Sequence, residues 1–257
     1  MVKEQFKVKN LGTEGNTTMQ LIGLIWFITI IILFCTSCKK ENAQQVDMGY
    51  NYVPLAEGNY VIYDVDSVFI DKFNKKKDTS KFQLKEEIGN SFHDLTGNLN
   101  YEYKRYKRFY KTNADINKTP WILTDVWYVK KTKDRFERIE ESFRYTRLKF
   151  PVMESSQWNG NAFNTNPIWN YTLKNVDTKL IIGKNKFDST STVLQRDFTS
   201  KNTKQYYIEI FARNIGLIYK KVIDVKTQDI SSHIEIMNKA DEGVIYEWTY
   251  LSHGKIN

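Results

Sequence analysis

Four acidic residues are candidates for paired-carboxylate chemistry. Asp64 and Asp66 belong to one alternating segment, and Glu86 and Glu87 belong to the next one along the chain. A glycosidase needs two carboxyl groups about 5 to 10 Å apart, one acting as an acid and the other as a base or nucleophile. Acids that alternate with apolar residues normally form the solvent face of a strand, so the pattern favours a structural role for these four residues.

The three histidines, His93, His233 and His253, are far apart and show neither HxH nor HxxxH spacing. A zinc site would need two or more of them to converge with a carboxylate, so we expect no metal site and no cofactor. A Ser-His-Asp triad is a spatial arrangement, but the chain has no GxSxG elbow and no P-loop spacing of glycines. The sequence favours a non-catalytic protein, with an enzyme as the open alternative.

Trp158, Phe163 and Trp169 are candidate ligand contacts on a long, Asn-rich connection. Aromatic faces beside amide side chains suit carbohydrate stacking or contact with a protein partner. The same rings could instead close one end of a barrel or pack over a sheet edge. Arg105 and Arg108, which alternate with tyrosines, could bind an anionic polymer or pack against tyrosines across strands.

The only two cysteines, Cys35 and Cys38, follow the apolar run Leu21–Phe34, LIGLIWFITIIILF. At about 1.5 Å per residue this run spans roughly 21 Å, which is short of the hydrocarbon core of about 30 Å. Its length is typical of the h-region of a signal peptide. An uncleaved signal anchor is the alternative.

The end of the run, Phe34-Cys35-Thr36-Ser37-Cys38, resembles a lipobox, the motif that lipoprotein signal peptidase cleaves. In that motif a small residue precedes an invariant cysteine, whose thiol receives a diacylglyceryl group before cleavage. Ser37 matches the small residue, whereas Cys35 stands where leucine is usual. The resemblance implies that Cys38 is the lipidation site, with palmitate-type acyl chains.

The resemblance also implies a domain organisation and a location. Residues 1–37 would be the lipoprotein signal peptide, and 38–49 a flexible polar tether. The acyl chains bury methylenes at about 0.8 kcal/mol each, which makes the anchor stable. Lys39 stands where an aspartate favours retention in the inner membrane of enteric bacteria. The implied location is therefore the cell envelope, at the outer membrane, with the domain facing the periplasm or the surface.

The net charge of the whole chain is +8, and that of the part from Cys38 onward is about +7. Lysine and arginine pairs alternate with aromatic and acidic residues, which is typical of a solvated basic face. Export makes nucleic acid an implausible partner. The predicted partners are the membrane, through the lipid, and an envelope protein or glycan.

Residues 50–257 are predicted to form a single β-rich domain. Aromatic residues make up 14% of the chain, and they favour half-buried strands. Short alternating segments are separated by polar turns, with no βαβ alternation. Phe136–Lys149 could be a helix or a strand, and we favour a strand. The sequence therefore predicts an all-β fold after the N-terminal apolar signal helix, an antiparallel barrel or sandwich of about ten strands.

The boundaries of two other segments are also predicted. Lys72–Ser80 is highly charged and is predicted to be a hairpin loop. Ile230–Met237 is predicted to be one of the last strands, because apolar residues alternate along it.

Two segments resemble a group of uncharacterised, Flavobacteria-like lipoproteins of the Bacteroidota. They are Tyr52–Tyr63 (YVPLAEGNYVIY) and Ala212–Lys220 (ARNIGLIYK). The shared pattern is Pro-Leu-x-x-Gly-Asn before an aromatic strand and Gly-Leu-x-Tyr before a late strand. These motifs are turn glycines and strand aromatics, so the resemblance implies no activity and no site residues.

The sequence as a whole predicts a lipid-anchored envelope lipoprotein with a non-catalytic binding or structural domain. Two alternatives remain open. The first is a lipocalin-like carrier of an apolar ligand, because some strands carry aromatic residues on both faces. The second is a protein that binds or processes glycans.

Overall fold

The computed structural model describes residues 23, 26, 46–74, 76–110, 115–231 and 233–256. Cys38 and the predicted signal peptide, apart from Gly23 and Trp26, lie outside the described residues. Asp47–Asn257 form one compact unit. None of the helices in the described part of the chain is both long enough and apolar enough to cross a membrane.

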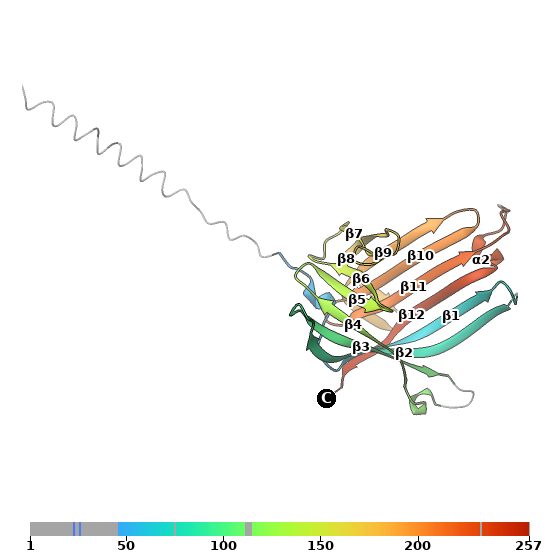
Figure 1. The fold of residues 1–257 in the computed structure, drawn as a ribbon, viewed down its shortest axis with the longest axis horizontal. Helices are drawn as coiled ribbons and strands as arrows, with labels where there is room; N and C mark the ends of the chain where they lie inside the picture. The colour runs from blue at the N-terminus through green and yellow to red at the C-terminus, as the bar shows by residue number, and fades with distance from the viewer. Residues whose placement is uncertain are drawn as a thin grey trace, which may run out of the picture. The chain divides into compact units, whose positions relative to one another are not determined.

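The compact unit is built around a single antiparallel sheet of twelve strands (Figure 1). The strands are β1 (Asn59–Asp71), β2 (Lys76–His93), β3 (Leu99–Phe109), β4 (Ile122–Lys131), β5 (Arg135–Glu140), β6 (Phe143–Lys149), β7 (Gln157–Asn159), β8 (Asn170–Ile182), β9 (Asn185–Thr199), β10 (Thr203–Ala212), β11 (Gly216–Lys226) and β12 (Glu242–Lys255). The short helices are η1 (Tyr50–Tyr52), η2 (Ile116–Lys118) and α2 (Ile236–Lys239). The fold is therefore all-β, as predicted.

The order of strands across the sheet is β6-β5-β4-β3-β2-β1-β12-β11-β10-β9-β8-β7. Nearly all neighbours in the sheet are also neighbours in the sequence. The exception is the pairing of β1 with β12, which joins the first and last strands in the middle of the sheet. Strands β6 and β7 are left at the two edges, linked by residues 150–156.

The two edges of the sheet meet and nearly close it into a barrel. The backbone N–H of Thr146 in β6 donates to the carbonyl of Gly160, just after β7, at 2.9 Å. The indole Nε1 of Trp158 donates to the carbonyl of Thr146, also at 2.9 Å. A Cβ at Gly160 would lie 2.2 Å from the ring of Tyr171, so this approach requires glycine. The barrel alternative of the prediction is therefore the one observed.

Register shifts bend the sheet enough to allow this closure. They interrupt the β1–β12, β9–β10 and β10–β11 pairs, among others. A bulge adds a residue to one strand, bends it and increases its twist. It also changes which residues face inward on either side of it, so the inward face cannot be followed by simple alternation along a whole strand.

Two predicted boundaries are wrong. Lys72–Ser80 was expected to be a loop, but β2 already begins at Lys76. The first residues of β2 are exposed, so their polarity reflects two solvated faces rather than a turn. Ile230–Met237 was expected to be a strand, but none of its described residues is in a strand, and Ile236 and Met237 belong to α2. Ile230 and Ile234 are exposed, so their alternation does not correspond to a buried face.

The ambiguous segment Phe136–Lys149 is extended, as favoured, but it forms two strands instead of one. Strands β5 and β6 are joined by a tight turn at Glu141 and Ser142, whose φ angles are 47° and 70°. Two successive residues with positive φ produce the kind of turn that suits the twist of a hairpin. The turn lacks the usual Asn-Gly or Asp-Gly sequence, so the pattern did not reveal it.

Candidate functional site

A layer of charged side chains crosses the interior of the barrel. Its members come from strands that are distant in the sequence, and together they are called the charged layer below. They are Glu86 (β2), Arg105 (β3), Arg138 and Glu140 (β5), Arg147 (β6), Glu209 (β10) and Lys220 (β11). The most exposed of these side chains, that of Glu140, is 18% exposed, so all seven are largely shielded from water.

One half of the charged layer is organised by Glu86. Arg105 Nη2 lies 2.5 Å from Oε1 of this carboxylate, and the hydroxyl of Tyr103 donates to Oε2 at 2.5 Å. Arg138 Nη1 lies 3.9 Å from Oε1 on another side. The guanidinium of Arg105 also stacks 4.3 Å from the ring centre of Trp127. Both carboxylate oxygens of Glu86 thus have partners. Arg138 also contacts Glu140 and Glu209, so it connects Glu86 to the other half of the layer.

The other half is organised by Glu209 and Glu140. Glu209 Oε1 lies 3.2 Å from Lys220 Nζ and 3.7 Å from Arg147 Nη1. Arg147 Nη2 donates to Glu140 Oε2 at 3.1 Å, and Arg138 forms an ion pair with Glu140. Arg138 Nη2 is also 4.0 Å from Glu209. Arg138 therefore has all three carboxylates within 4.0 Å.

The surrounding cations keep Glu140 and Glu209 ionised. Burial raises the pKa of the Glu209 carboxyl, but the charges of Lys220 and Arg147 outweigh burial, so the pKa lies below its ordinary value. Burial also raises the pKa of Glu140, and here Arg138 and Arg147 shift it well below the ordinary value. A carboxyl group in this setting cannot supply a proton at neutral pH.

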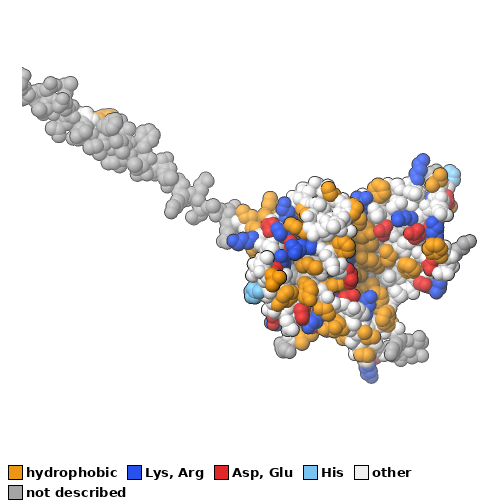
Figure 2. All heavy atoms as spheres, viewed as in Figure 1, with side chains coloured by type: hydrophobic (Ala, Val, Ile, Leu, Met, Phe, Trp, Pro, Cys, Tyr) orange, Lys and Arg blue, Asp and Glu red, His pale blue; other side chains and the backbone are white. Residues whose placement is uncertain are grey.

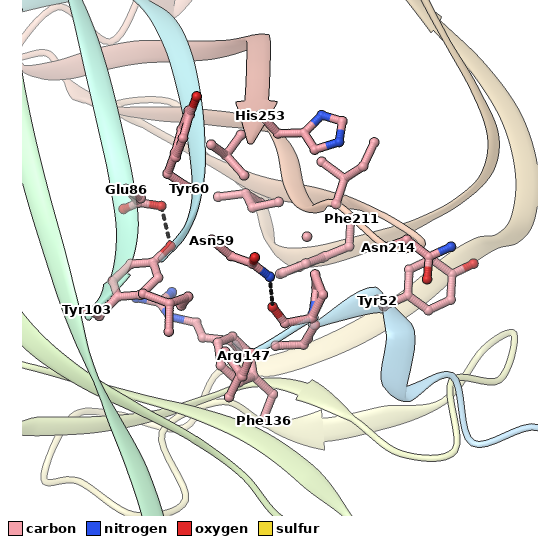
Figure 3. A pocket seen from close by; sticks show the side chains of 18 of the residues that line it. Tyr52, Asn59, Tyr60, Glu86, Tyr103, Phe136, Arg147, Phe211, Asn214 and His253 are labelled. Carbon is pink, nitrogen blue, oxygen red and sulfur yellow. Dashed lines mark hydrogen bonds between the residues drawn. The ribbon is translucent and has the colours of Figure 1, made fainter. Parts of the chain in front are cut away.

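A cavity of about 330 Å³ lies on one side of the charged layer (Figure 3). Its apolar lining comes from the segment after η1 and from β1, β2, β10 and β11, with Leu55, Val61 and Leu217 as examples. Aromatic rings complete the walls, among them those of Tyr60, Tyr103, Phe136 and Phe211 (Figure 3). The polar part of the lining includes four residues of the charged layer and, outside it, Asn59, Asn214, His253 and Lys255. The four are Glu86, Arg138, Arg147 and Glu209.

The segment before β1 holds one wall of this cavity in place. The ring of Tyr52 is fully buried, and its hydroxyl donates to Asp177 at 2.8 Å. Arg213 Nε donates to the same carboxylate at 2.7 Å and stacks its guanidinium 4.7 Å from the Tyr52 ring centre. The pKa of Asp177 is well below its ordinary value, chiefly because it accepts hydrogen bonds from Arg213. This cluster fixes the chain that leads from η1 into the cavity wall.

A second cleft, of about 580 Å³, also receives residues of the charged layer. Glu140, Arg147 and Lys220 line it, and Arg147 lines the first cavity as well. The remaining lining is mostly aromatic rings and side-chain amides from β8 to β12 and from the Asn-rich connection. Figure 2 shows a hollow on the viewed face, with hydrophobic side chains along it and charges of both signs nearby.

The three predicted aromatic contacts do not form one site. Trp158 is buried in the core, with its ring 5.8 Å from that of Tyr171 in an edge-to-face arrangement. Phe163 is exposed and stacks against the guanidinium of Arg135 at 4.5 Å. Only Trp169 lines one of the two hollows, the second cleft. Trp158 thus packs at the barrel closure, and ligand contact by Trp169 stays a prediction.

The four candidate carboxylates are divided between the two faces of the sheet. Asp64 accepts a hydrogen bond from the hydroxyl of Tyr110 at 2.5 Å, and Asp66 forms an exposed ion pair with Lys81. Glu87 pairs with Lys85 at 2.7 Å. Glu86 alone faces the interior, where it is 3% exposed. The expectation of a solvent-facing strand is therefore wrong for Glu86.

The histidines and the two candidate arginines are also separated. All three histidines are exposed. His253 borders the first cavity, with Nδ1 2.6 Å from the hydroxyl of Tyr250. Within the described ranges, no set of three His, Cys, Asp or Glu side chains is placed to hold a metal ion.

Arg105 lies inside the barrel, and Arg108 stacks 4.3 Å from the ring centre of Trp121. Both arginines therefore pack against tryptophans, Arg105 against Trp127, instead of against the tyrosines considered for this role.

The chain was also compared with known proteins. No family model matches it, and no curated protein matches it. Two solved structures share 10% identity with it, a "putative exported protein with YmcC-like fold" from Bacteroides fragilis and a "putative lipoprotein" from Parabacteroides distasonis. Each alignment covers 79% of this chain and 98% of the other chain, with a TM-score of 0.38.

Proposed function

We propose that the chain is a lipid-anchored protein of the cell envelope whose β domain binds a small ligand without transforming it. The proposed anchor is the lipid on Cys38, and the lack of an aspartate after it favours the outer membrane. The observation that carries the binding function is the cavity of about 330 Å³ beside the charged layer. Small-molecule sites are typically concave and mostly apolar, with a few placed polar groups.

The lining of the cavity indicates the kind of ligand. Its walls are aliphatic and aromatic, which favours a ligand with an apolar body. The charged-layer groups in its lining are already paired, because Glu86 pairs with Arg105, Glu209 with Lys220 and Arg147 with Glu140. A charged ligand would have to compete with these pairs. We therefore propose a ligand with an apolar body and at most a neutral polar end, in the manner of a lipocalin.

Glycan processing is the less favoured function. A glycosidase needs one carboxylic acid that stays protonated until it donates its proton. The pKa of Glu140 and that of Glu209 are both lowered by neighbouring cations, which is the opposite of the shift that an acid catalyst requires.

The binding proposal predicts that filling the cavity abolishes binding of an apolar probe. We expect a fragment of residues 47–257, the compact unit, to bind one equivalent of the neutral fluorophore N-phenylnaphthylamine. Val61→Phe adds bulk to the cavity wall and should weaken binding by at least about tenfold, or about 1.4 kcal/mol. Ile181→Phe, at a site that is 65% exposed, is the matched control. Equal binding by both variants, measured by fluorescence titration, would contradict the proposal.

The anchor proposal predicts complete loss of lipidation in Cys38→Ala. The thiol of this residue is the only acceptor that the lipobox resemblance provides. Cells fed an alkyne fatty acid should label the parent chain and Cys35→Ala, but not Cys38→Ala. The unlabelled variant should keep its uncleaved precursor mass. Labelling of Cys38→Ala at the parent level would overturn the proposal.

A further inference from the structure

We propose that the second cleft binds an acidic saccharide, with Arg196 contacting the sugar carboxylate and Trp169 contacting the sugar ring. The cleft measures about 580 Å³, which is room for one or two sugar residues beside the aromatic rings. This site is distinct from the apolar cavity, so the inference does not rest on the proposed apolar ligand.

Arg196 in β9 differs from the other cations of the cleft. Arg147 and Lys220 are committed to Glu140 and Glu209 through the charged layer. Arg196 has no carboxylate within 4.0 Å among the residues that the structure describes, and its one side-chain hydrogen bond runs from Nε to Gln205 Oε1 at 3.3 Å. A guanidinium has five N–H donors in a fork that matches a carboxylate. Arg196 therefore offers donors for an anionic group.

Gln195 adds a second, independent observation. Its side chain lines the cleft and is 3% exposed, and its Nε2 has no hydrogen-bond partner within the described part of the chain. A buried amide donor normally has a partner. Gln195 therefore adds a polar side chain with an unused donor to the wall of the cleft.

Trp169 gives the cleft an aromatic surface with a fixed orientation. Its ring packs edge-to-face on that of Tyr207, with the centroids 4.9 Å apart. The hydroxyl of Tyr207 in turn donates to Asp224 at 2.6 Å, and the guanidinium of Arg196 lies 5.3 Å from the Trp169 ring centre. The aromatic ring and the guanidinium of Arg196 are thus adjacent, as recognition of a sugar ring that bears a carboxylate requires.

The Asn-rich connection contributes Asn161, Asn166 and Pro167 to the lining of the cleft and is held in shape by hydrogen bonds. Asn161 Nδ2 donates to the carbonyl of Pro167 at 2.6 Å, and Trp169 N donates to the side chain of Asn159 at 3.2 Å. These bonds set the path of the loop that carries Trp169. Because the loop is fixed by its own hydrogen bonds, the cleft is preformed and a ligand would not have to order it.

The experiment measures binding of trigalacturonate to the full chain in detergent by isothermal titration calorimetry. Its methyl ester, which keeps the rings but removes the charge, is the matched ligand. We expect Arg196→Gln to weaken trigalacturonate binding by at least about tenfold and to leave binding of the ester unchanged. Trp169→Ala should weaken both ligands. Lys174→Gln, an exposed charge loss on β8, and Phe163→Ala, an exposed ring outside the cleft, should weaken neither.

Three results would overturn the inference. One is that the parent chain binds neither saccharide, and another is that Lys174→Gln weakens binding as much as Arg196→Gln, which would indicate non-specific attraction. The third is displacement of N-phenylnaphthylamine by the saccharide, because that would place both in a single site. Loss of N-phenylnaphthylamine binding alone would count against the apolar cavity and would not affect the saccharide site.

Discussion

Replacing Glu209 with alanine is expected to lower the free energy of unfolding of the β domain by about 3–5 kcal/mol. The side chain of Glu209 is 1% exposed and lies within 4.0 Å of Lys220, Arg147 and Arg138. Its removal would leave these cations buried with too little negative charge. The cost of that uncompensated charge exceeds the loss of packing alone. Urea unfolding, with the midpoint shift compared at constant m-value, measures the change.

A double variant separates the effect of charge from the effect of size. Glu209→Leu combined with Lys220→Met removes one charge of each sign and keeps apolar bulk at both positions. Replacing a buried ion pair in this way is often neutral or stabilising. The double variant should therefore be markedly more stable than Glu209→Ala. If the free energy of unfolding of Glu209→Ala is within about 1 kcal/mol of that of the parent, the Glu209 carboxylate does not compensate the buried cations.

Acidification is expected to destabilise the domain strongly below about pH 5, through the same layer. The pKa values of Glu140 and Glu209 are lower in the folded protein than the ordinary value of 4.5. Below that value the unfolded chain binds protons that the folded chain does not, so stability falls as the pH falls. The stabilisation by these two carboxylates is complete when the pH is above their ordinary pKa. It is lost progressively as the pH drops toward their pKa values in the folded protein. Each unit of difference between the folded and unfolded pKa of a carboxyl group corresponds to about 1.4 kcal/mol of stability.

Urea midpoints measured between pH 7 and pH 3 test this expectation. Other acidic residues contribute to acid unfolding, so the informative quantity is the difference between variants. The Glu209→Leu, Lys220→Met double variant lacks one carboxyl group whose pKa is lowered by folding. It should therefore lose less stability over this pH range than the parent. Parallel curves for the two proteins would show that Glu209 does not titrate as inferred.

The strands could be predicted well where one face was apolar and the register was simple. The alternation in Tyr60–Ile70 predicts β1 to within one residue at each end. Prediction failed where burial departed from that pattern. The start of β2 is solvated on both faces and therefore resembles a loop, and the exposed isoleucines of 230–237 resemble a strand. A sequence pattern reports polarity, and polarity indicates a strand only when one face is covered.

The charged layer could not be predicted because its partners are far apart in the sequence. Glu86 interrupts the apolar row of Leu84 and Ile88, and Glu209 lies between Ile208 and Ile210. Each looks like an ordinary charged residue of a half-exposed strand. Only closure of the sheet brings β2, β5 and β10 around a common interior, and closure depends on bulges that have no sequence signature here. Trp169 could be proposed as a contact from its loop, but the nearby Arg196 could not.

The charged layer also determines how uniquely the strands can pair. In the observed register Glu209 lies opposite Lys220. A shift of β10 by one residue would turn Glu209 to the outer face and place Ile208 or Ile210 opposite Lys220, leaving a buried cation without its partner. A one-residue shift moves every inward-facing side chain of a strand to the other face, which is costly wherever one face is buried. The unpaired charge adds to that cost. The buried pair of Glu209 and Lys220 therefore helps to select the observed pairing of β10 with β11 over a pairing shifted by one residue.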